Sequence, residues 1–414
     1  MSANQLPLRP FPGTPPTASP AHLHPSLSAP CESGNTKLRV LFIAPAGEGV
    51  GGIISQCNAL VRELNRQKLV DLKVIDSTQR YRDYHDLGIL SRAWGGGWAA
   101  IRRIMELWDS LLRFKPESVA IASSASLGLV RDDVLVALAR LMGAKAFVSF
   151  HFGRIPQLAI QRNWEWRLLS WAVRMANGVQ VLDCHSLAVL VDRFPKRTIR
   201  QMPNAVDFDW IDKIRSTVRV SRTRRNIPHL VFVGLLLPAK GVVELVEVCS
   251  RILEPDFELE MVGPVGPEMS EKLHGLASKR DEGRWLKFTG SLSREEAVAH
   301  IAAADVFVLP SYTEGFPGSV LEAMACGVAI VATSVGAIPE MLMGDDGEAA
   351  GIIVPPQDSE SLKLALEDLL QNPARRSELG ASARRKSEAN YQLSDLARRW
   401  AVLWSGHESS SKPS

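Results

Sequence analysis

The sequence predicts two doubly wound α/β domains that face each other across a cleft. Two series of short apolar runs support this prediction, because parallel strands buried on both faces are apolar at nearly every position, and here helical stretches separate the runs. The chain has 414 residues, enough for two or three domains with full hydrophobic cores. Apolar residues make up 46% and charged residues 22%, and these ordinary values exclude a mostly disordered, collagenous or coiled-coil chain.

The first domain is expected over residues 37–205. It follows a proline-rich stretch, 1–36, which has no apolar periodicity and is expected to be disordered. Its six strands are predicted at 38–44, 72–75, 119–122, 146–150, 179–182 and 198–202.

The second domain is expected over residues 206–385, and a stretch of mixed charge, 203–225, joins the two. A last helix at 393–404 has one apolar face and needs a surface to cover, so 386–405 forms a separate C-terminal segment. The tail 406–414 is expected to be disordered. The six strands of the second domain are predicted at 230–233, 259–262, 286–289, 306–309, 329–332 and 352–354.

Charge and cysteine content restrict the function and the compartment. The formal net charge of +3 is too small for wholesale binding of a nucleic-acid backbone. Five cysteines, at least 26 residues apart, give neither a disulfide framework nor a CxxC metal site, so a reduced, cytoplasmic compartment is expected. No stretch approaches ~18 consecutive apolar residues. We therefore expect a soluble protein, or one that is at most attached to the cytoplasmic face of a membrane.

A glycine-rich loop, Gly47-Glu48-Gly49-Val50-Gly51-Gly52, follows the first predicted strand and precedes a predicted helix. Bare backbone amides at a helix N-terminus attract a phosphate, and glycine lets it come close. The spacing of Gly47, Gly49 and Gly52 also fits a dinucleotide fingerprint, with Asp76 at the end of the next strand. An NAD(P)-dependent oxidoreductase is therefore one alternative, although a tight strand-to-helix turn needs glycine in any fold.

Charged residues follow two strands of the second domain. Lys240 lies in the loop 234–241, where an ammonium near a helix start could neutralise a leaving diphosphate. Glu314 and Glu322 follow the strand at 306–309, and a helix is predicted from about Pro317 to residue 326. Two carboxylates at this strand end can accept hydrogen bonds from the hydroxyls of a sugar and a ribose.

The ordered set of motifs resembles the retaining GT-B glycosyltransferases of family 4, over about residues 37–405. The resemblance rests on the Glu-x7-Glu element 314–322 with its continuation to 327, the glycine-rich loop, a histidine after the fourth strand, and the segments 203–207, 240–241, 290–291, 304–311 and 336–340. It implies two Rossmann-like domains and a C-terminal helix that crosses back to the first domain. It also implies an acceptor site in the first domain and a nucleotide-sugar site in the second.

The resemblance also implies roles for single residues. His151, Lys240 and Glu314 are implied as catalytic: His151 would face the transferred sugar, Lys240 would hold the diphosphate, and Glu314 would bind sugar hydroxyls. The implied donor-binding residues are Gly51, Gly52, Arg154, Lys240, Gly290, Ser291, Glu314, Gly315, Phe316, Pro317 and Glu322. Among these, Glu322 would bind the ribose. No metal or other cofactor is implied, and the donor would be a UDP- or GDP-linked sugar.

Leu235 departs from the family pattern, which usually has an arginine at this position beside the diphosphate. We hypothesise that Arg154 supplies the missing charge across the cleft. His151 has a second interpretation as a packed, hydrogen-bonded core residue, since it lies between two aromatic residues. Asp207-Phe208-Asp209 formally matches a metal-binding DxD signature, but its place in the linker favours a solvated turn.

The segment 94–115 is rich in tryptophan and arginine at near-helical spacing. Such a helix could lie on an anionic membrane, helped by Arg62, Arg66 and Lys68, or it could be an ordinary domain helix that packs on the sheet.

The expected function is transfer of a hexosyl unit from a nucleoside-diphosphate sugar to a glycan or lipid-linked acceptor, with retention of anomeric configuration, in cell-envelope or exopolysaccharide biosynthesis. The alternatives are the NAD(P)-dependent oxidoreductase, a sugar-nucleotide-binding protein with little transfer activity, and an epimerase of the same fold.

Overall fold

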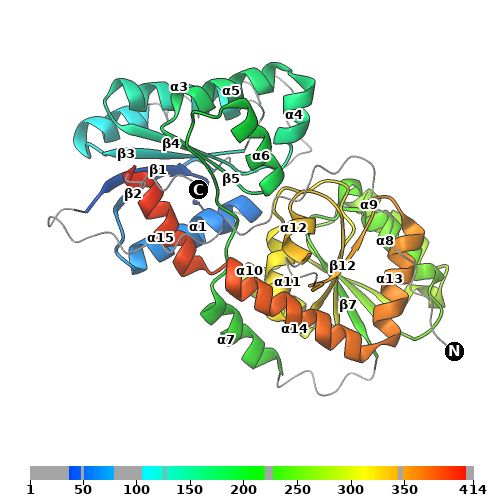
Figure 1. Ribbon diagram of the computed structural model, residues 1–414. Coiled ribbons are helices and arrows are strands. Elements are labelled where there is room, and N and C mark those ends of the chain that lie inside the picture. Colours follow the sequence, from blue (N-terminus) through cyan, green and yellow to red (C-terminus); the bar gives the residue numbers. More distant parts are fainter. Residues whose placement is uncertain are drawn as a thin grey trace.

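The computed structural model describes residues 37–47, 51–78, 105–124, 126, 128–219, 227–343 and 348–406. Within these ranges the chain forms two α/β domains, each built on a six-stranded sheet (Figure 1). The predicted fold class is confirmed. The stretch 1–36 and the residues after 406, both expected to be disordered, lie outside the described residues.

The first sheet has the strand order β2-β1-β3-β4-β5-β6, and all its neighbours are parallel. All six predicted strands are present. The inner strands are apolar runs because a parallel strand is covered on both faces, whereas the edge strands β2 and β6 include polar residues such as Lys73 and Arg200. The strands are β1 (Arg39–Ala44), β2 (Asp71–Asp76), β3 (Ser118–Ser123), β4 (Lys145–Phe150), β5 (Gly178–Val181) and β6 (Ile199–Gln201).

Helices cover both faces of the first sheet. One face packs on α1 (Gly52–Arg66) and on the last helix, α15 (Leu393–Ser405). The other face packs on residues 105–113, which are helical, and on α3 (Gly128–Leu141), α4 (Ile155–Gln161), α5 (Trp164–Met175) and α6 (Cys184–Arg193). Figure 1 shows α3 and α5 above the sheet, and α1 and α15 below it.

The second sheet has the order β12-β11-β10-β7-β8-β9, again parallel throughout. Read from β9, this is the 3-2-1-4-5-6 order of a dinucleotide-binding fold, whose direction of winding reverses between β7 and β10. The six predicted strands are present as β7 (His229–Val233), β8 (Glu258–Val262), β9 (Leu286–Gly290), β10 (Val306–Leu309), β11 (Ala329–Thr333) and β12 (Ile352–Val354).

The helices of the second domain form two groups. One group contains α8 (Val242–Arg251), α9 (Pro267–Ala277) and α13 (Ser359–Gln371), and the other contains α7 (Phe208–Arg219), α10 (Arg294–Ala303), α11 (Gly318–Cys326) and α14 (Pro373–Asn390). The short elements are α12 (Ile338–Leu342) and the 3₁₀ turns η3 (Pro238–Lys240) and η4 (Asp281–Gly283).

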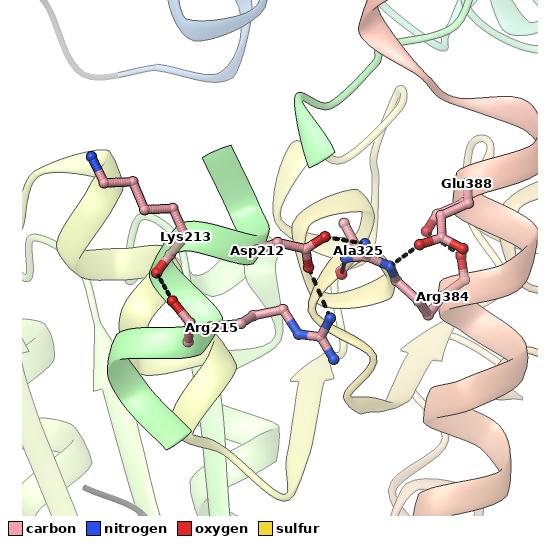
Figure 2. Close-up of polar contacts among 8 residues, drawn as sticks. Asp212, Lys213, Arg215, Ala325, Arg384 and Glu388 are labelled. Atoms are coloured by element: carbon pink, nitrogen blue, oxygen red, sulfur yellow. Dashed lines mark hydrogen bonds and ion pairs between the residues drawn. The ribbon is translucent and has the colours of Figure 1, made fainter. Parts of the chain in front are cut away.

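The linker helix α7 belongs structurally to the second domain, where it packs on α10 and α11. Figure 2 shows the ion pairs that fix it: Arg384 of α14 contacts Asp212 of α7 at 2.8 Å and Glu388 at 2.5 Å. The same guanidinium lies over the ring of Phe208, 4.7 Å from its centroid. An arginine this enclosed (14% side-chain exposure) ties the first and last helices of the domain together.

The chain passes between the domains at two adjacent points. Val206 N–H donates to the Tyr391 carbonyl at 2.9 Å, and Leu393 N–H donates to the Val206 carbonyl at 3.0 Å. The boundary expected at residue 385 is therefore corrected to Tyr391, because α14 continues without a break to Asn390. After this point α15 packs on α1, with Leu396, Trp400 and Leu403 buried as predicted.

Candidate active site

Lys240 and Glu314 meet at the point where the second sheet reverses its winding. Lys240 lies in the loop after β7 and Glu314 in the loop after β10, and these two strands are neighbours in the sheet. Lys240 Nζ contacts Glu314 Oε1 at 2.7 Å, and their side chains are 28% and 10% exposed. Open α/β sheets bind ligands at this edge, so the pair occupies the expected position for a nucleotide site.

Close backbone packing fixes both loops. Gly241 has a φ of +68°, and a Cβ there would lie 2.1 Å from the Pro310 carbonyl oxygen. Gly336, with a φ of +56°, brings its backbone equally close, since its Cβ would lie 2.5 Å from the carbonyl oxygens of Glu314 and Gly315. Glycine is required at both positions. The Lys240 and Glu314 loops are therefore held by rigid main-chain contacts.

The first domain reaches this site through the loop after β4. A Cβ at Gly153 would lie 2.7 Å from the Glu314 carbonyl oxygen and 2.8 Å from Gly315 Cα, so the two backbones touch across the domain interface. Asn204 adds a second contact, because its Nδ2 donates to the Phe316 carbonyl at 2.9 Å. The predicted residues 151–154 and 314–316 thus come together from opposite domains.

His151 is half-buried, with Nε2 3.1 Å from Ser149 Oγ. Burial lowers the pKa of His151 from 6.5 to about 4, so its imidazole is neutral near pH 7. It lines a cavity of about 20 Å³ together with Gln56 and Asn204. Ligand sites are typically ~300–1,000 Å³. This cavity is too small for a sugar nucleotide, and neither Lys240 nor Glu314 lines it.

Arg154 interacts within its own domain. Its Nη2 donates to Ser126 Oγ at 2.9 Å and lies 3.0 Å from Glu165 Oε2. The side chain is still 46% exposed. The hypothesis that Arg154 replaces the arginine missing at Leu235 would require it to leave a carboxylate that is almost fully buried. Leu235 itself is 43% exposed in the loop after β7.

Glu322 lies in the second turn of α11, which begins at Gly318. Pro317, expected at the first helical position, takes the N-cap position instead. Arg294 Nε donates to Glu322 Oε1 at 2.7 Å, and the guanidinium lies over the Trp210 ring, 4.7 Å from its centroid. Burial raises the pKa of Glu322, and the charge of Arg294 opposes this shift. One carboxylate oxygen remains for a ligand hydroxyl.

The loop between β1 and α1 is braced by Asp76. Asp76 Oδ1 accepts hydrogen bonds from Ala46 N at 3.1 Å and from Thr78 N at 2.8 Å. A Cβ at Gly52 would meet no described atom within 4 Å, so packing among the described residues does not require this glycine. Glu48, Gly49 and Val50 lie outside the described residues. Since Asp76 holds its own loop, it is poorly placed to bind the ribose of a dinucleotide.

The remaining predicted residues lie around the same edge. Gly290, with a φ of +74°, ends β9, and Ser291 is exposed in the loop before α10. Asp207 Oδ1 accepts from Trp210 N at 3.2 Å, which makes the Asp207-Phe208-Asp209 motif a helix start. Among the residues that the structure describes, no group of three or more metal-ligating side chains is suitably placed for a metal ion.

The contacts of three further residues near the site were not predicted from the sequence, although Glu340 lies in the motif 336–340. Arg294 partners Glu322, Trp210 supports Arg294, and Glu340 joins the domains by accepting from Cys184 N at 2.9 Å and from the Gln201 side chain. Only Arg294 had a usable signal, since Ser293 and Glu296 form a capping box that marks the start of a helix directly after Gly290 and Ser291.

Comparison with known proteins agrees with this geometry. Residues 215–386 match the family model described as glycosyl transferases group 1. The chain carries a group 1 glycosyltransferase domain. This domain includes Lys240, Glu314, Glu322 and Arg294, which are the charged residues described above at the edge of the second sheet.

The most informative relative is the GDP-mannose-dependent alpha-(1-6)-phosphatidylinositol monomannoside mannosyltransferase of Mycolicibacterium smegmatis. It is 32% identical over 224 residues, which cover 51% of this chain and 57% of the relative. The chain spans about half the length of the curated relatives it matches.

Solved structures extend the similarity to both domains. Sucrose-phosphate synthase from Thermosynechococcus elongatus has a TM-score of 0.70 at 19% identity and covers 89% of this chain and 98% of its own. Anabaena Alr3699/HepE in complex with UDP has a TM-score of 0.65 at 15% identity and covers 89% and 100%. The architecture around the group 1 domain is therefore the GT-B fold. Across the described ranges, every helix is too short or too polar to cross a membrane.

Proposed function

We propose that this protein transfers a hexosyl unit from a nucleoside-diphosphate sugar to a glycan or lipid-linked acceptor. The observation that carries the proposal is the Lys240–Glu314 ion pair, which lies in a group 1 domain at the point where the sheet reverses its winding. The names of the relatives support a nucleotide-sugar donor, since one is GDP-mannose-dependent and one neighbour was solved with UDP. We extend the proposal to retention of anomeric configuration, independence of metal, and a role in cell-envelope or exopolysaccharide biosynthesis.

Each group at the site has a use in this reaction. Breaking the anomeric C–O bond places positive charge on the sugar and negative charge on the departing diphosphate. An ammonium has three N–H donors, so the contact with Glu314 leaves two donors on Lys240 for diphosphate oxygens. Glu314 Oε2 is left for sugar hydroxyls, and Glu322 Oε2 for the ribose. Stabilisation of the leaving diphosphate by Lys240 is electrostatic and needs no rearrangement of the loop.

The acceptor would approach from the first domain. Neutral His151 and the loop 151–154 face the Glu314 loop, so they can orient the acceptor beside the sugar. We propose that the leaving phosphate takes the proton of the acceptor hydroxyl on the same face of the sugar, which gives retention without a protein nucleophile. Because the domains are linked at Val206 and Tyr391, closure about these residues would exclude water.

The experiment is a donor screen followed by product analysis. The protein is incubated with UDP-, GDP-, ADP- and TDP-sugars and an acceptor extract, and nucleoside diphosphate release is measured together with the mass and anomeric configuration of the product. The proposal predicts release that depends on acceptor and is lost in Glu322→Ala. NAD(P)H binding that depends on Asp76 would instead support an oxidoreductase, and isomerisation of the donor sugar would reveal an epimerase.

A sugar-nucleotide-binding protein with little transfer remains the second candidate, and Leu235 is the observation that favours it. The exposed leucine leaves the diphosphate with Lys240 as its cation on this loop, and Arg154 is engaged with Glu165. Donor binding without turnover against any acceptor would support this candidate.

A further inference from the structure

Exposed apolar side chains concentrate on one face of the first domain. Of the eighteen large hydrophobic side chains that are exposed in the described part of the chain, twelve lie in this domain. They include every exposed tryptophan among the described residues, Trp108, Trp164 and Trp171. The other nine are Met105, Leu112, Val130, Val134, Leu141, Met142, Ile160, Met175 and Val191.

Helix α5 has two apolar faces. Leu169, Ala172 and Val173 point inward and are almost completely buried in the core. The opposite side has an exposed stripe at positions i, i+3, i+7, i+10 and i+11. This stripe consists of Trp164, Arg167, Trp171, Arg174 and Met175.

Helix α3 and residues 105–113 repeat this arrangement. In α3, Val130, Val134 and Leu141 are exposed on the side opposite the core residues. In 105–113, Leu107 and Leu111 are buried while Met105, Trp108 and Leu112 are exposed. Since α3 packs directly on α5 and both cover the same face of the sheet, their outer sides form one surface. Figure 1 shows the two helices together along the upper edge of the first domain. We call this surface the α3–α5 face.

The exposed charge of α3 and α5 is entirely positive, whereas the segment 105–113 carries the exposed ion pair Arg113–Asp109. The arginines 140, 162, 167 and 174 are exposed and have no ion-pair partner within the described ranges, whereas the acids of α3 and α5, Asp132, Asp133 and Glu165, are buried. The helices of the second domain differ, because they carry exposed charges of both signs, and some of these form ion pairs, as in Arg251–Glu360 and Arg375–Asp368.

We propose that the α3–α5 face docks on an anionic lipid surface. Amphipathic helices that combine exposed tryptophan and aliphatic side chains with arginine bind in the headgroup region, where indole rings are preferred and cations meet lipid phosphates. The aliphatic members favour lipid over an anionic glycan, since a sugar needs the aromatic rings but not Val130, Val134, Leu141 or Ile160. An exposed apolar surface on two adjacent helices that carry no exposed acid is also unusual on a monomer.

This surface adjoins the proposed acceptor site. Glu165, in the first turn of α5 beside Trp164, forms the ion pair with Arg154, and Arg154 belongs to the loop that contacts Glu314 and Gly315. A lipid-borne acceptor would therefore enter the cleft from the bound membrane. This last step rests on the proposed function, whereas docking itself does not.

The surface differs from the one expected from the sequence. Only residues from 105 onward of the segment 94–115 are described, and Leu107 and Leu111 pack on the sheet as in an ordinary domain helix. Arg62, Arg66 and Lys68 lie at the end of α1, on the opposite side of the sheet. The contribution of α3 and α5 could not be anticipated, because an apolar residue on a helix in a sequence is normally assigned to the core.

Vesicle flotation of the full chain tests the proposal. We expect the protein to float with vesicles that contain about 30% phosphatidylglycerol, to float less with pure phosphatidylcholine, and to be released by salt. Trp164→Gln with Trp171→Gln should weaken partitioning roughly tenfold. Arg167→Gln with Arg174→Gln should remove the preference for the anionic vesicles. The matched control is Leu253→Gln with Leu364→Gln, which changes two exposed apolar residues of the second domain and should leave flotation unchanged.

Several results would overturn the proposal. These are a wild-type protein that stays unbound at low salt, tryptophan variants that float like the wild type, and a dimer in solution that the tryptophan variants dissociate. Competition by dextran sulfate but not by vesicles would assign the surface to a polysaccharide. Nucleoside diphosphate release with a water-soluble acceptor is measured in parallel. If the wild-type protein released no nucleoside diphosphate, the proposed function would be refuted but membrane docking would not. If the variants release nucleoside diphosphate at the wild-type rate, they are folded.

Discussion

The loops that follow the first strand of each domain occupy equivalent positions but are built differently. In the first domain, the loop before α1 is tightly packed where it leaves the sheet, since a Cβ at Gly47 would lie 2.3 Å from Asp76 Oδ2, but the start of α1 is open, since a Cβ at Gly52 would meet no described atom within 4 Å. In the second domain, the loop before α8 is tightly packed, because a Cβ at Gly241 would lie 2.1 Å from the Pro310 carbonyl oxygen. The first loop has no lysine or arginine, whereas the second contains Lys240.

The difference indicates a division of roles between two similar folds. The open start of α1 leaves space in which backbone amides can approach a phosphate, and the packed loop before α8 places a fixed cation beside a carboxylate. Gly52 would thus serve a ligand, whereas Gly241 serves the fold. The variants at Lys240, Gly241, Gly52 and Leu235 each change one of these two loops, and Arg294→Gln changes the neighbouring Glu322 contact.

Lys240→Met should have the largest effect. Without the ammonium, the developing charge on the diphosphate loses its nearest cation, and kcat/KM should fall by about 10²–10³. Steady-state kinetics of nucleoside diphosphate release measure this loss. Lys272→Met, an exposed lysine on α9, is the matched control and should retain wild-type kinetics. A loss below about fivefold for Lys240→Met would mean that this loop does not bind the leaving group.

Alanine substitutions at Gly241 and Gly52 should separate stability from activity. Gly241→Ala forces a side chain into a φ of +68° and against a carbonyl, and should lower the free energy of unfolding by about 3 kcal/mol. Gly52→Ala should leave that free energy unchanged or raise it by up to about 1 kcal/mol, since alanine favours a helix start. Its kcat/KM should still fall by about tenfold. Denaturant titration and kinetics together test the contrast, which fails if both variants are equally stable.

Arg294→Gln should change the pH dependence of donor binding. Glu322 must be ionised to accept ribose hydroxyls, so donor affinity is lost as pH falls through its pKa. Burial raises that pKa above the ordinary 4.5 and Arg294 opposes the rise, so removal of the guanidinium should move the loss of affinity to higher pH.

Donor dissociation constants between pH 5 and 8 measure the Arg294→Gln effect, which should approach tenfold at the acid end of this range. Arg251→Gln, which removes an exposed ion pair with Glu360, is the control. A uniform weakening at every pH would show that Arg294 contacts the donor directly and does not act through Glu322. His151, with a pKa of about 4, should add no inflection near pH 6.5 in either variant.

All twelve strands could be predicted because their physical signal is local. A strand such as Val306–Leu309 is apolar at every position since both its faces are covered, and no distant information is needed to recognise it. The same holds for α15, whose three apolar residues on one face predicted burial. The end of α14 was less accessible, because no proline or glycine marks it near Tyr391, and the glycine that the helix does contain, Gly380, lies in its interior.

The contacts of the site depend on distant partners and were only partly predictable. The family resemblance assigned Lys240 and Glu314 to one donor site, but their direct ion pair depends on β7 lying beside β10, which the sequence does not encode locally. Arg154 was expected to serve the donor, yet it contacts Glu165, eleven residues further along the chain. A long flexible cation can reach several carboxylates, and only the packed structure selects among them.

Leu235→Arg should have the smallest effect and tests the comparison from the opposite direction. Leu235 is 43% exposed, so an arginine can replace it without disturbing the core, and it would give the second loop a cation on each side of the diphosphate. We expect the donor dissociation constant to fall by about threefold to tenfold, because a single charge-assisted hydrogen bond at an exposed position contributes about 1 kcal/mol.

Leu237→Arg, at a residue 50% exposed in the same loop, is the matched control for the added charge alone. Isothermal titration with the donor at two salt concentrations measures both variants. Equal gains would mean that the loop attracts the donor only by net charge, whereas a gain confined to Leu235→Arg would show that the second loop is built to hold a phosphate at that position and that the natural leucine weakens this contact.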